Sequence, residues 1–237
     1  MRPLEIRKLG VIGYDEALAL QRELVEARRA DQIPDTLLLL EHPHVLTLGV
    51  RASRSTDGAA EGHWPNVLAS RERLVELGVA VHETGRGGDV TYHGPGQIVG
   101  YPILDLRPDR QDVHRYVRDL EEVLIRACGD FGIDAHRVAG LTGAWVDHPA
   151  RAPEKIAAIG VRIARWITSH GFALNVNTVL EYFELIVPCG IADRGVTSFQ
   201  ARLGHPVEPA LVEDRLVARF ADVFERHPVP RLASQES

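Results

Sequence analysis

The feature that most constrains the fold is a pair of apolar segments, residues 156–163 and 167–176, with only three residues between them. We expect both segments to be strands, and so short a connection predicts that they form a β-hairpin. Other strand-like segments follow one another in the middle of the chain without helices between them. This order predicts a mixed, largely antiparallel sheet rather than a doubly wound parallel one. The further strands are expected at residues 36–40, 45–48, 79–82, 90–92, 98–104 and 143–146.

Helical spacing of apolar residues appears in three places: residues 14–29, residues 112–131 and the segment that follows Pro209. A shorter helix is expected at residues 68–77. Because these helices would pack on the sheet, the expected fold class is α/β in the broad sense, or α+β, with a mixed central sheet flanked by helices.

Length and composition place the chain among folded proteins. Of its 237 residues, 45% are hydrophobic and 25% are charged, which is ordinary globular usage. No internal repeat is present, so we expect a single domain over residues 1–237, with a core at about 4–226 and a tail at 227–237. The formal net charge is −6 and no dense block of Lys or Arg occurs, so nucleic acid is not an expected partner.

Other residue patterns exclude further classes of protein. Two cysteines are too few for a disulfide framework, which favours a reducing compartment. The chain has neither a secretory signal nor a run of about eighteen apolar residues, so we expect no membrane insertion and a cytoplasmic location. None of the 11 histidines forms a cluster with metal-ligand spacing, so no metal site is expected.

The densest unusual stretch runs from Thr84 to Gln97 and holds five of the 21 glycines. Glycine at this density lets the backbone approach a ligand closely or reach positive φ, so the stretch is a candidate binding loop. It matches neither a Walker loop nor the dinucleotide-binding fingerprint that opens a helix. The alternative is a strand pair with tight turns at Gly87-Gly88 and Pro95-Gly96.

The two cysteines have different settings. Cys128 lies on the apolar face of the helix at residues 112–131, and we expect it to be buried in the core. Cys189 stands between Pro188 and Gly190, which interrupt both helix and strand, so its thiol is expected on a turn that a substrate can reach. A thiol acts as a nucleophile only as thiolate, which requires a neighbouring cation or a helix N-terminus.

Lysine is scarce in this chain, which draws attention to each one. Only Lys8 and Lys155 are present, and Lys155 begins the apolar strand at residues 156–163. Strand alternation sends the Glu154 carboxylate to the opposite face, so it is not expected to neutralise the Lys155 ammonium. The alternative is a lysine whose stem covers apolar surface while its charge remains in water.

Together these residues resemble the lipoyl(octanoyl) transferase family over nearly the full chain. Four blocks carry the resemblance, and they occur in the family's order: 40–43 (Leu-Glu-His-Pro), 86–97 within the glycine-rich stretch, 155–163, and 170–176 followed by Pro188-Cys189-Gly190-Ile191. The resemblance implies a fold shared with the catalytic domains of biotin and lipoate protein ligases. That implied fold agrees with the sheet and helices expected above.

The resemblance also implies a reaction, the first step of protein lipoylation. An octanoyl group would pass from octanoyl-acyl carrier protein to Cys189 and then to a lysine of an apo lipoyl domain, as found in 2-oxoacid dehydrogenases and the glycine cleavage H protein. Lys155 would hold the Cys189 thiolate and take the proton of the attacking amine. No metal, ATP or other cofactor would be needed, and we expect a monomer. The substrate-binding residues implied are Arg86, Gly87, Gly88, Asp89, Val90, Thr91, Tyr92, His93, Ala158, Ile159, Gly160, Gly171, Phe172 and Ala173.

Four other functions remain open on the sequence alone, and one of them is an amidotransferase that moves the acyl group between protein lysines. A lipoate or biotin protein ligase would use ATP and an adenylate, but the Arg86-Gly87-Gly88-Asp89 stretch differs from the loops of those ligases. A cysteine hydrolase would need a His and an Asn or Asp partner, and no spacing singles one out. A non-catalytic binding module would be expected to lack Cys189 or Lys155, and both are present.

Overall fold

The expected hairpin lies at the centre of the fold. In the computed structural model, which describes residues 1–54, 64, 66–187 and 195–230, β9 (Arg151–Ala164) and β10 (Ile167–Asn175) pair antiparallel. Arg165 and Trp166 make the turn between them with positive φ angles of 52° and 68°. Six further strands extend this pair into an eight-stranded sheet. Their order across the sheet is β11 (Arg226–Val229), β1 (Arg2–Val11), β2 (Asp35–Glu41), β6 (Gln97–Ile103), β10, β9, β8 (Leu141–His148) and β7 (Ala135–Val138).

The sheet is mixed and largely antiparallel, as expected. Only β1 runs parallel to its neighbours, β2 on one side and β11 on the other. A separate three-stranded sheet, which the sequence did not predict as separate, has the order β4 (Ala80–Glu83), β3 (Val45–Leu48), β5 (Val90–His93). It carries the second half of the glycine-rich stretch, because β5 follows directly after Asp89.

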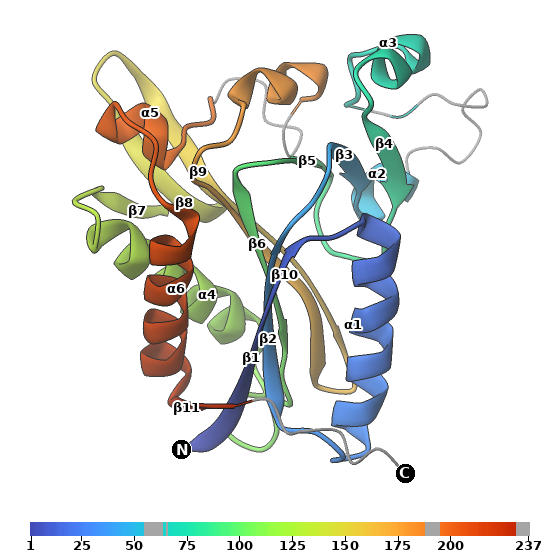
Figure 1. Cartoon of the computed structure of the whole chain (residues 1–237), viewed down its shortest axis with the longest axis vertical. Coiled ribbons are helices and arrows are strands. Elements are labelled where there is room, and N and C mark those ends of the chain that lie inside the picture. The colour runs from blue at the N-terminus through green and yellow to red at the C-terminus, as the bar shows by residue number, and fades with distance from the viewer. Residues whose placement is uncertain (55–63, 65, 188–194, 231–237) are drawn as a thin grey trace.

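Three long helices cover the two faces of the large sheet (Figure 1). Helix α1 (Tyr14–Arg29) lies on one face against β10 and β6, while α4 (Val113–Gly129) and α6 (Pro209–Phe224) pack together on the other face. The helical spacing in the sequence predicted all three, and Asp112 caps α4 by accepting a hydrogen bond from the Arg115 N–H. The short helices are α2 (Val50–Arg54), α3 (Arg71–Glu76), α5 (Phe199–Leu203) and the 3₁₀ helix η1 (Leu180–Leu185).

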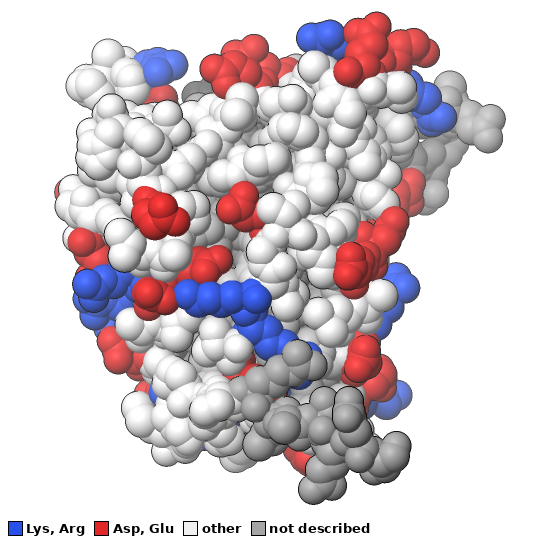
Figure 2. Space-filling model, in the orientation of Figure 1, with Lys and Arg blue, Asp and Glu red and all other residues white. Residues whose placement is uncertain are grey.

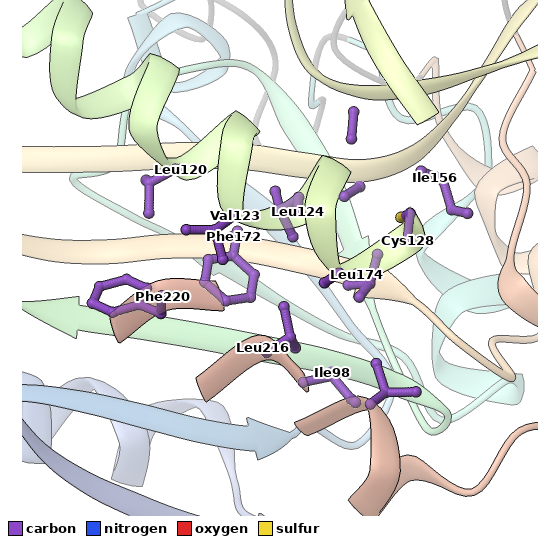
Figure 3. Packing of buried hydrophobic residues seen from close by; sticks show 14 of the residues in the cluster. Ile98, Leu120, Val123, Leu124, Cys128, Ile156, Phe172, Leu174, Leu216 and Phe220 are labelled. Atoms are coloured by element: carbon purple, nitrogen blue, oxygen red, sulfur yellow. The ribbon is translucent and has the colours of Figure 1, made fainter. Parts of the chain in front are cut away.

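The main core lies between the sheet and the α4–α6 pair. Figure 3 shows Leu120, Leu124 and Cys128 of α4 facing Phe172 and Leu174 of β10, with Leu216 and Phe220 of α6 beside them. Cys128 is fully buried, and burial raises the pKa of its thiol to about 12. The prediction that Cys128 is a core residue is therefore confirmed.

Both ends of the described chain belong to one edge of the large sheet, which the sequence did not predict. We expected a tail from residue 227, but residues 226–229 form β11 and pair in register with residues 2–5 of β1. Both strands carry charged residues and a proline, so they lack the apolar pattern that marks a buried strand. Ionic contacts hold them instead: the buried Arg226 guanidinium lies 2.9 Å from the Asp35 carboxylate, which also pairs with Arg28.

Basic and acidic side chains are interspersed on the face shown in Figure 2, with wide uncharged areas between them. No helix among the described residues is long and apolar enough to cross a membrane.

Candidate active site

A cavity of about 430 Å³ lies where the glycine-rich stretch meets β9 and β10. Strand β8 pairs with β9 only as far as Ala157, so residues 158–161 border an open edge of the sheet. The glycine-rich stretch lies along this edge, and the Gly87 N–H donates to the Val161 carbonyl over 2.9 Å. The cavity is therefore bordered by backbone from two distant parts of the sequence.

The sequence-predicted residues converge on this cavity. Lys155 lines it, together with thirteen of the fourteen residues predicted to bind substrate. These thirteen are Arg86, Gly87, Gly88, Asp89, Val90, Thr91, His93, Ala158, Ile159, Gly160, Gly171, Phe172 and Ala173. The remaining one, Tyr92, points to the opposite face of β5, where its ring stacks on Tyr182 and its hydroxyl lies 2.8 Å from His44 Nδ1.

Glycine is required where the loop approaches β9. A Cβ atom on Gly160 would lie 3.1 Å from both the Gly87 carbonyl oxygen and Arg86 Cδ, closer than most side chains tolerate. Gly88 has a φ of +96°, which side-chain-bearing residues rarely adopt. The loop is also tied to the start of α2, because Arg86 and Gly88 accept hydrogen bonds from the N–H groups of Val50 and Arg51. These contacts make the loop part of a fixed wall.

Arg86 supplies a buried positive charge beside the cavity. Its Nε and Nη2 donate to the hydroxyl and carbonyl oxygens of Thr47, and Nη1 donates to the Gly87 carbonyl over 3.0 Å. The side chain lines the cavity but is only 7% exposed. It both fixes the loop and adds to the positive potential inside the cavity.

Lys155 is positioned by an irregular pairing of β8 and β9. Ala144 pairs with Ala157 but its neighbour Trp145 pairs with Lys155, so β9 carries one extra residue at this point. Such a bulge re-aims the side chains beside it. The Lys155 ammonium lies 4.7 Å from the centroid of the Trp145 ring, within range of a cation–π interaction, and the residue is 8% exposed.

The backbone of Lys155 is paired with a segment that follows the predicted nucleophile in sequence. The Lys155 N–H donates to the Gly195 carbonyl and the Lys155 carbonyl accepts from the Thr197 N–H, both over 3.0 Å. Cys189 itself lies outside the described residues. On its N-terminal side, the Val187 N–H donates to the Asn66 carbonyl, and the Asn66 side chain donates to the Asp89 carboxylate over 3.1 Å.

Three titratable side chains that line the cavity are uncharged at neutral pH. Burial, together with the neighbouring His42 and Arg86, lowers the pKa of His93 to about 3, and burial together with Arg86 lowers that of His170 to about 4. Burial also raises the pKa of Tyr14 to about 12. Each of these side chains lines the cavity in its neutral form.

Several lining residues were not among the catalytic and substrate-binding residues predicted from the sequence: Tyr14, Arg51, Tyr101, Val117, Gly140, Leu141, Thr142, Val161 and His170. One signal was available for His170, because it begins a sequence block that carries the family resemblance. Nothing local marks Tyr14 or Tyr101, since their proximity depends on how α1 and β6 pack beside β10. Among the described residues, no group of three or more His, Cys, Asp or Glu side chains could hold a metal ion.

Comparison with known sequences gives a consistent result. Residues 13–221 match the lipoyl protein ligase A/B catalytic domain family. The chain is 54% identical over 231 residues to an octanoyltransferase of Acidobacterium capsulatum, a match that covers 94% of this chain and 89% of that protein. It is 49% identical over 230 residues to an octanoyltransferase of Solibacter usitatus, with 97% of each chain covered.

Solved structures give the same fold. A bipartite lipoate protein ligase from Thermoplasma acidophilum matches with a TM-score of 0.70 at 15% identity, covering 98% of this chain and 88% of that one. A biotin protein ligase from Aquifex aeolicus in complex with biotin and ATP matches with a TM-score of 0.53 at 13% identity. The match covers 95% of this chain and 71% of that one. The expected fold class is thereby confirmed.

Proposed function

The chain belongs to the octanoyltransferases of the lipoyl protein ligase A/B catalytic domain family, and from this premise we propose a two-step transfer through Cys189. The donor is octanoyl-acyl carrier protein and the acceptor is a lysine ε-amine of an apo lipoyl domain. The observation that carries the proposal is the convergence of Lys155 and thirteen predicted substrate-binding residues on one cavity.

The lining of the cavity supports an aliphatic substrate. Ile159, Phe172 and Ala173 give it apolar walls, and Gly160 and Gly171 leave room beside backbone groups. Each methylene of an octanoyl chain that leaves water contributes about 0.8 kcal/mol to binding. The fixed N–H groups of the loop are candidate donors to the thioester carbonyl oxygen as negative charge develops on it.

Two anchors support Cys189 as the residue that receives the acyl group. Val187, two positions before it, is held beside Asn66 and hence beside Asp89 of the cavity wall. Gly195, six positions after it, is hydrogen-bonded to the Lys155 backbone. Both described ends of the segment that carries Cys189 are therefore fixed at the cavity.

In the first step the Cys189 thiolate attacks the thioester carbonyl, and the carrier arm leaves as a thiol that takes a proton from the Lys155 ammonium. An enzyme thioester replaces a carrier thioester, so little free energy changes. In the second step the acceptor amine attacks, an amide forms, and Cys189 leaves as thiolate. The neutral Lys155 amine takes the proton that the acceptor amine loses, and the ammonium so formed stabilises the departing Cys189 thiolate. The acyl group arrives activated, so neither step requires ATP.

The test is the intact mass of the protein after mixing with octanoyl-acyl carrier protein, before and after an apo lipoyl domain is added without ATP. The wild type should gain one octanoyl group and then pass it on, and Cys128→Ser should behave the same because Cys128 is buried in the core. Cys189→Ser should form no adduct, and Lys155→Ala should form it more slowly.

Transfer that needs ATP and free octanoate would instead indicate ligase chemistry, which the fold also supports. A wild type that forms no adduct yet transfers octanoate with ATP would overturn the role of Cys189.

A further inference from the structure

One carboxylate lies on the buried face of α4. Glu121 is 1% exposed, beside Leu120 and Leu124, and among the buried residues of α4 it is the one with a charged side chain. A buried carboxylate is costly unless it is paired and hydrogen-bonded. Glu121 Oε2 accepts from Arg118 over 2.9 Å and from Arg137 over 3.1 Å. The function proposed above assigns no role to this side chain.

The other oxygen of the Glu121 carboxylate reaches the sheet. The Gly143 N–H of β8 donates to Glu121 Oε1 over 3.1 Å, in a buried contact between helix and strand. Gly143 has a φ of +122°, and a Cβ atom there would lie 2.5 Å from the Ala157 carbonyl oxygen of β9. Glycine is therefore required at this point of β8, and its N–H is directed at the helix.

The same stretch of β8 contacts the Lys155 side chain at two places. A Cβ atom added to Gly143 would lie 3.6 Å from Lys155 Cε, so the lysine stem passes beside this bare backbone. Two residues later, the Trp145 ring centroid lies 4.7 Å from Lys155 Nζ. The irregular pairing of β8 with β9 falls between Ala144 and Trp145. Residues 143–145 therefore determine where the stem and the ammonium of Lys155 lie.

Glu121 stabilises this irregular stretch from the helix side. An irregular pairing disrupts the regular ladder of backbone hydrogen bonds, so a backbone group beside it needs another partner. Glu121 provides that partner for the Gly143 N–H. Without the carboxylate, a buried donor would be left unsatisfied, and β8 would relax away from the conformation that it has beside Lys155.

We propose that Glu121 is a positioning residue for Lys155, and that it acts through the Gly143 N–H. This inference rests on the proposed function, in which Lys155 Nζ gives up a proton in the first step and takes one in the second. Each proton transfer requires Nζ within hydrogen-bonding reach of the reacting group. Glu121 itself does not line the cavity, so its effect reaches the reaction through Lys155 alone.

The position of Lys155 is measured directly by NMR, because the chain has only two lysines. Protein labelled with ¹³C-lysine gives one Hε–Cε signal from Lys8 and one from Lys155, and Lys8→Arg assigns them. The Trp145 ring face should shift the Lys155 signal upfield. Glu121→Met removes both carboxylate oxygens but keeps an unbranched side chain of similar length, and most of this upfield shift should be lost.

Two control variants separate the hydrogen bond to Gly143 from the surrounding ion pairs. Glu122→Met changes the next residue of α4, which also pairs with Arg137 but is 30% exposed and bonds only to arginine side chains. Arg137→Ala removes an ionic partner of Glu121 and leaves Arg118 and the Gly143 N–H in place. The Lys155 signal should stay near its wild-type position in both variants.

Steady-state kinetics show whether this position matters for transfer. Glu121→Met should lower kcat about ten-fold or more, because a catalytic group displaced by about 1 Å can cost about 100-fold in rate. KM for octanoyl-acyl carrier protein should change much less, since neither Glu121 nor Gly143 lines the cavity. Both control variants should keep kcat close to the wild-type value.

A folded Glu121→Met protein whose Lys155 signal keeps its wild-type position would overturn the inference. An equal displacement of the signal in Glu122→Met would also overturn it, and Glu121→Ala gives the same comparison if the methionine variant does not fold. If the wild type transfers no acyl group, the proposed function fails instead. The Lys155 signal still decides in that case whether Glu121 positions the lysine.

Discussion

The side-chain amide of Gln97 donates a hydrogen bond to Oδ1 of Asn175 over 2.9 Å, and this contact lies within a longer buried chain. At one end Gln97 Oε1 is 2.7 Å from His93 Nδ1, and at the other Asn175 Nδ2 donates to the Thr197 carbonyl over 3.0 Å. The Thr197 N–H donates in turn to the carbonyl of Lys155. A continuous polar chain thus joins the glycine-rich wall to the backbone of Lys155.

Breaking this chain at Asn175 should reduce transfer as well as stability. Asn175→Ala removes a donor and an acceptor from buried partners, so we expect a loss of about 1–3 kcal/mol in unfolding free energy. We also expect kcat to fall several-fold, because the segment paired with Lys155 loses the hydrogen bond from Asn175 Nδ2 to the Thr197 carbonyl. The matched control is Asn177→Ala, since Asn177 makes two hydrogen bonds to the Val207 backbone, away from Lys155. Equal losses of kcat in both variants would contradict a positioning role for Asn175.

The ring of Trp145 should matter through its π face. Trp145→Phe keeps an aromatic face toward the Lys155 ammonium, whereas Trp145→Leu does not. A cation–π contact of about 0.5–2 kcal/mol predicts that Trp145→Leu has the lower kcat/KM of the two, by roughly two-fold to thirty-fold. Steady-state kinetics across pH would detect the difference. Indistinguishable profiles of kcat/KM against pH for the two variants would show that the cation–π contact contributes nothing to catalysis.

Adding one methyl group to Gly160 should displace the binding loop. In Gly160→Ala the new Cβ presses on the Gly87 carbonyl and on Arg86, so we expect KM for the acyl donor to rise about ten-fold through a shift of the loop by a few tenths of an ångström. Gly129→Ala is the control, because a Cβ there has no neighbour within 4 Å and Gly129 ends α4. That change should leave KM unaltered and leave stability equal or slightly higher.

Acid should destabilise the protein partly through His170. Its folded-state pKa of about 4 is below the value of an unfolded histidine, so the unfolded chain binds more protons between the two. The stabilisation is fully present above about pH 6.5 and is lost as pH falls toward 4; by about pH 5 the loss is about 2 kcal/mol. Chemical denaturation above pH 6.5 and at about pH 5 measures the unfolding free energy in each state. The loss between the two should be smaller for His170→Asn than for the wild type, and asparagine tolerates the same backbone conformation. Equal losses in the wild type and in His170→Asn would mean that His170 is already protonated in the folded protein at about pH 5.

The elements predicted from sequence are those whose pattern is local. The hairpin, the helices at 14–29 and 112–131, and the burial of Cys128 all follow from apolar spacing, and the structure contains each of them. Strand alternation could also have excluded Tyr92 from the cavity, because Thr91 and His93 on either side of it line that cavity.

The features missed depend on contacts between distant segments. Tyr14 and Tyr101 reach the cavity through the way α1 and β6 pack beside β10, which no short window of sequence encodes. His170 breaks the alternation of its strand with a positive φ, and that φ is supported by Gln21, 149 residues earlier in the chain. The place of His170 at the cavity therefore became visible only in the folded molecule.

The pairing of β11 with β1 has a consequence for biosynthesis. Residues 2–5 leave the ribosome more than two hundred residues before their partners at residues 226–229 are made. Throughout that interval one edge of β1 presents unpaired backbone groups to the cell, the kind of edge on which nascent chains join one another. Slow translation between the two strands should therefore lengthen the time over which the edge of β1 is open to association with other chains.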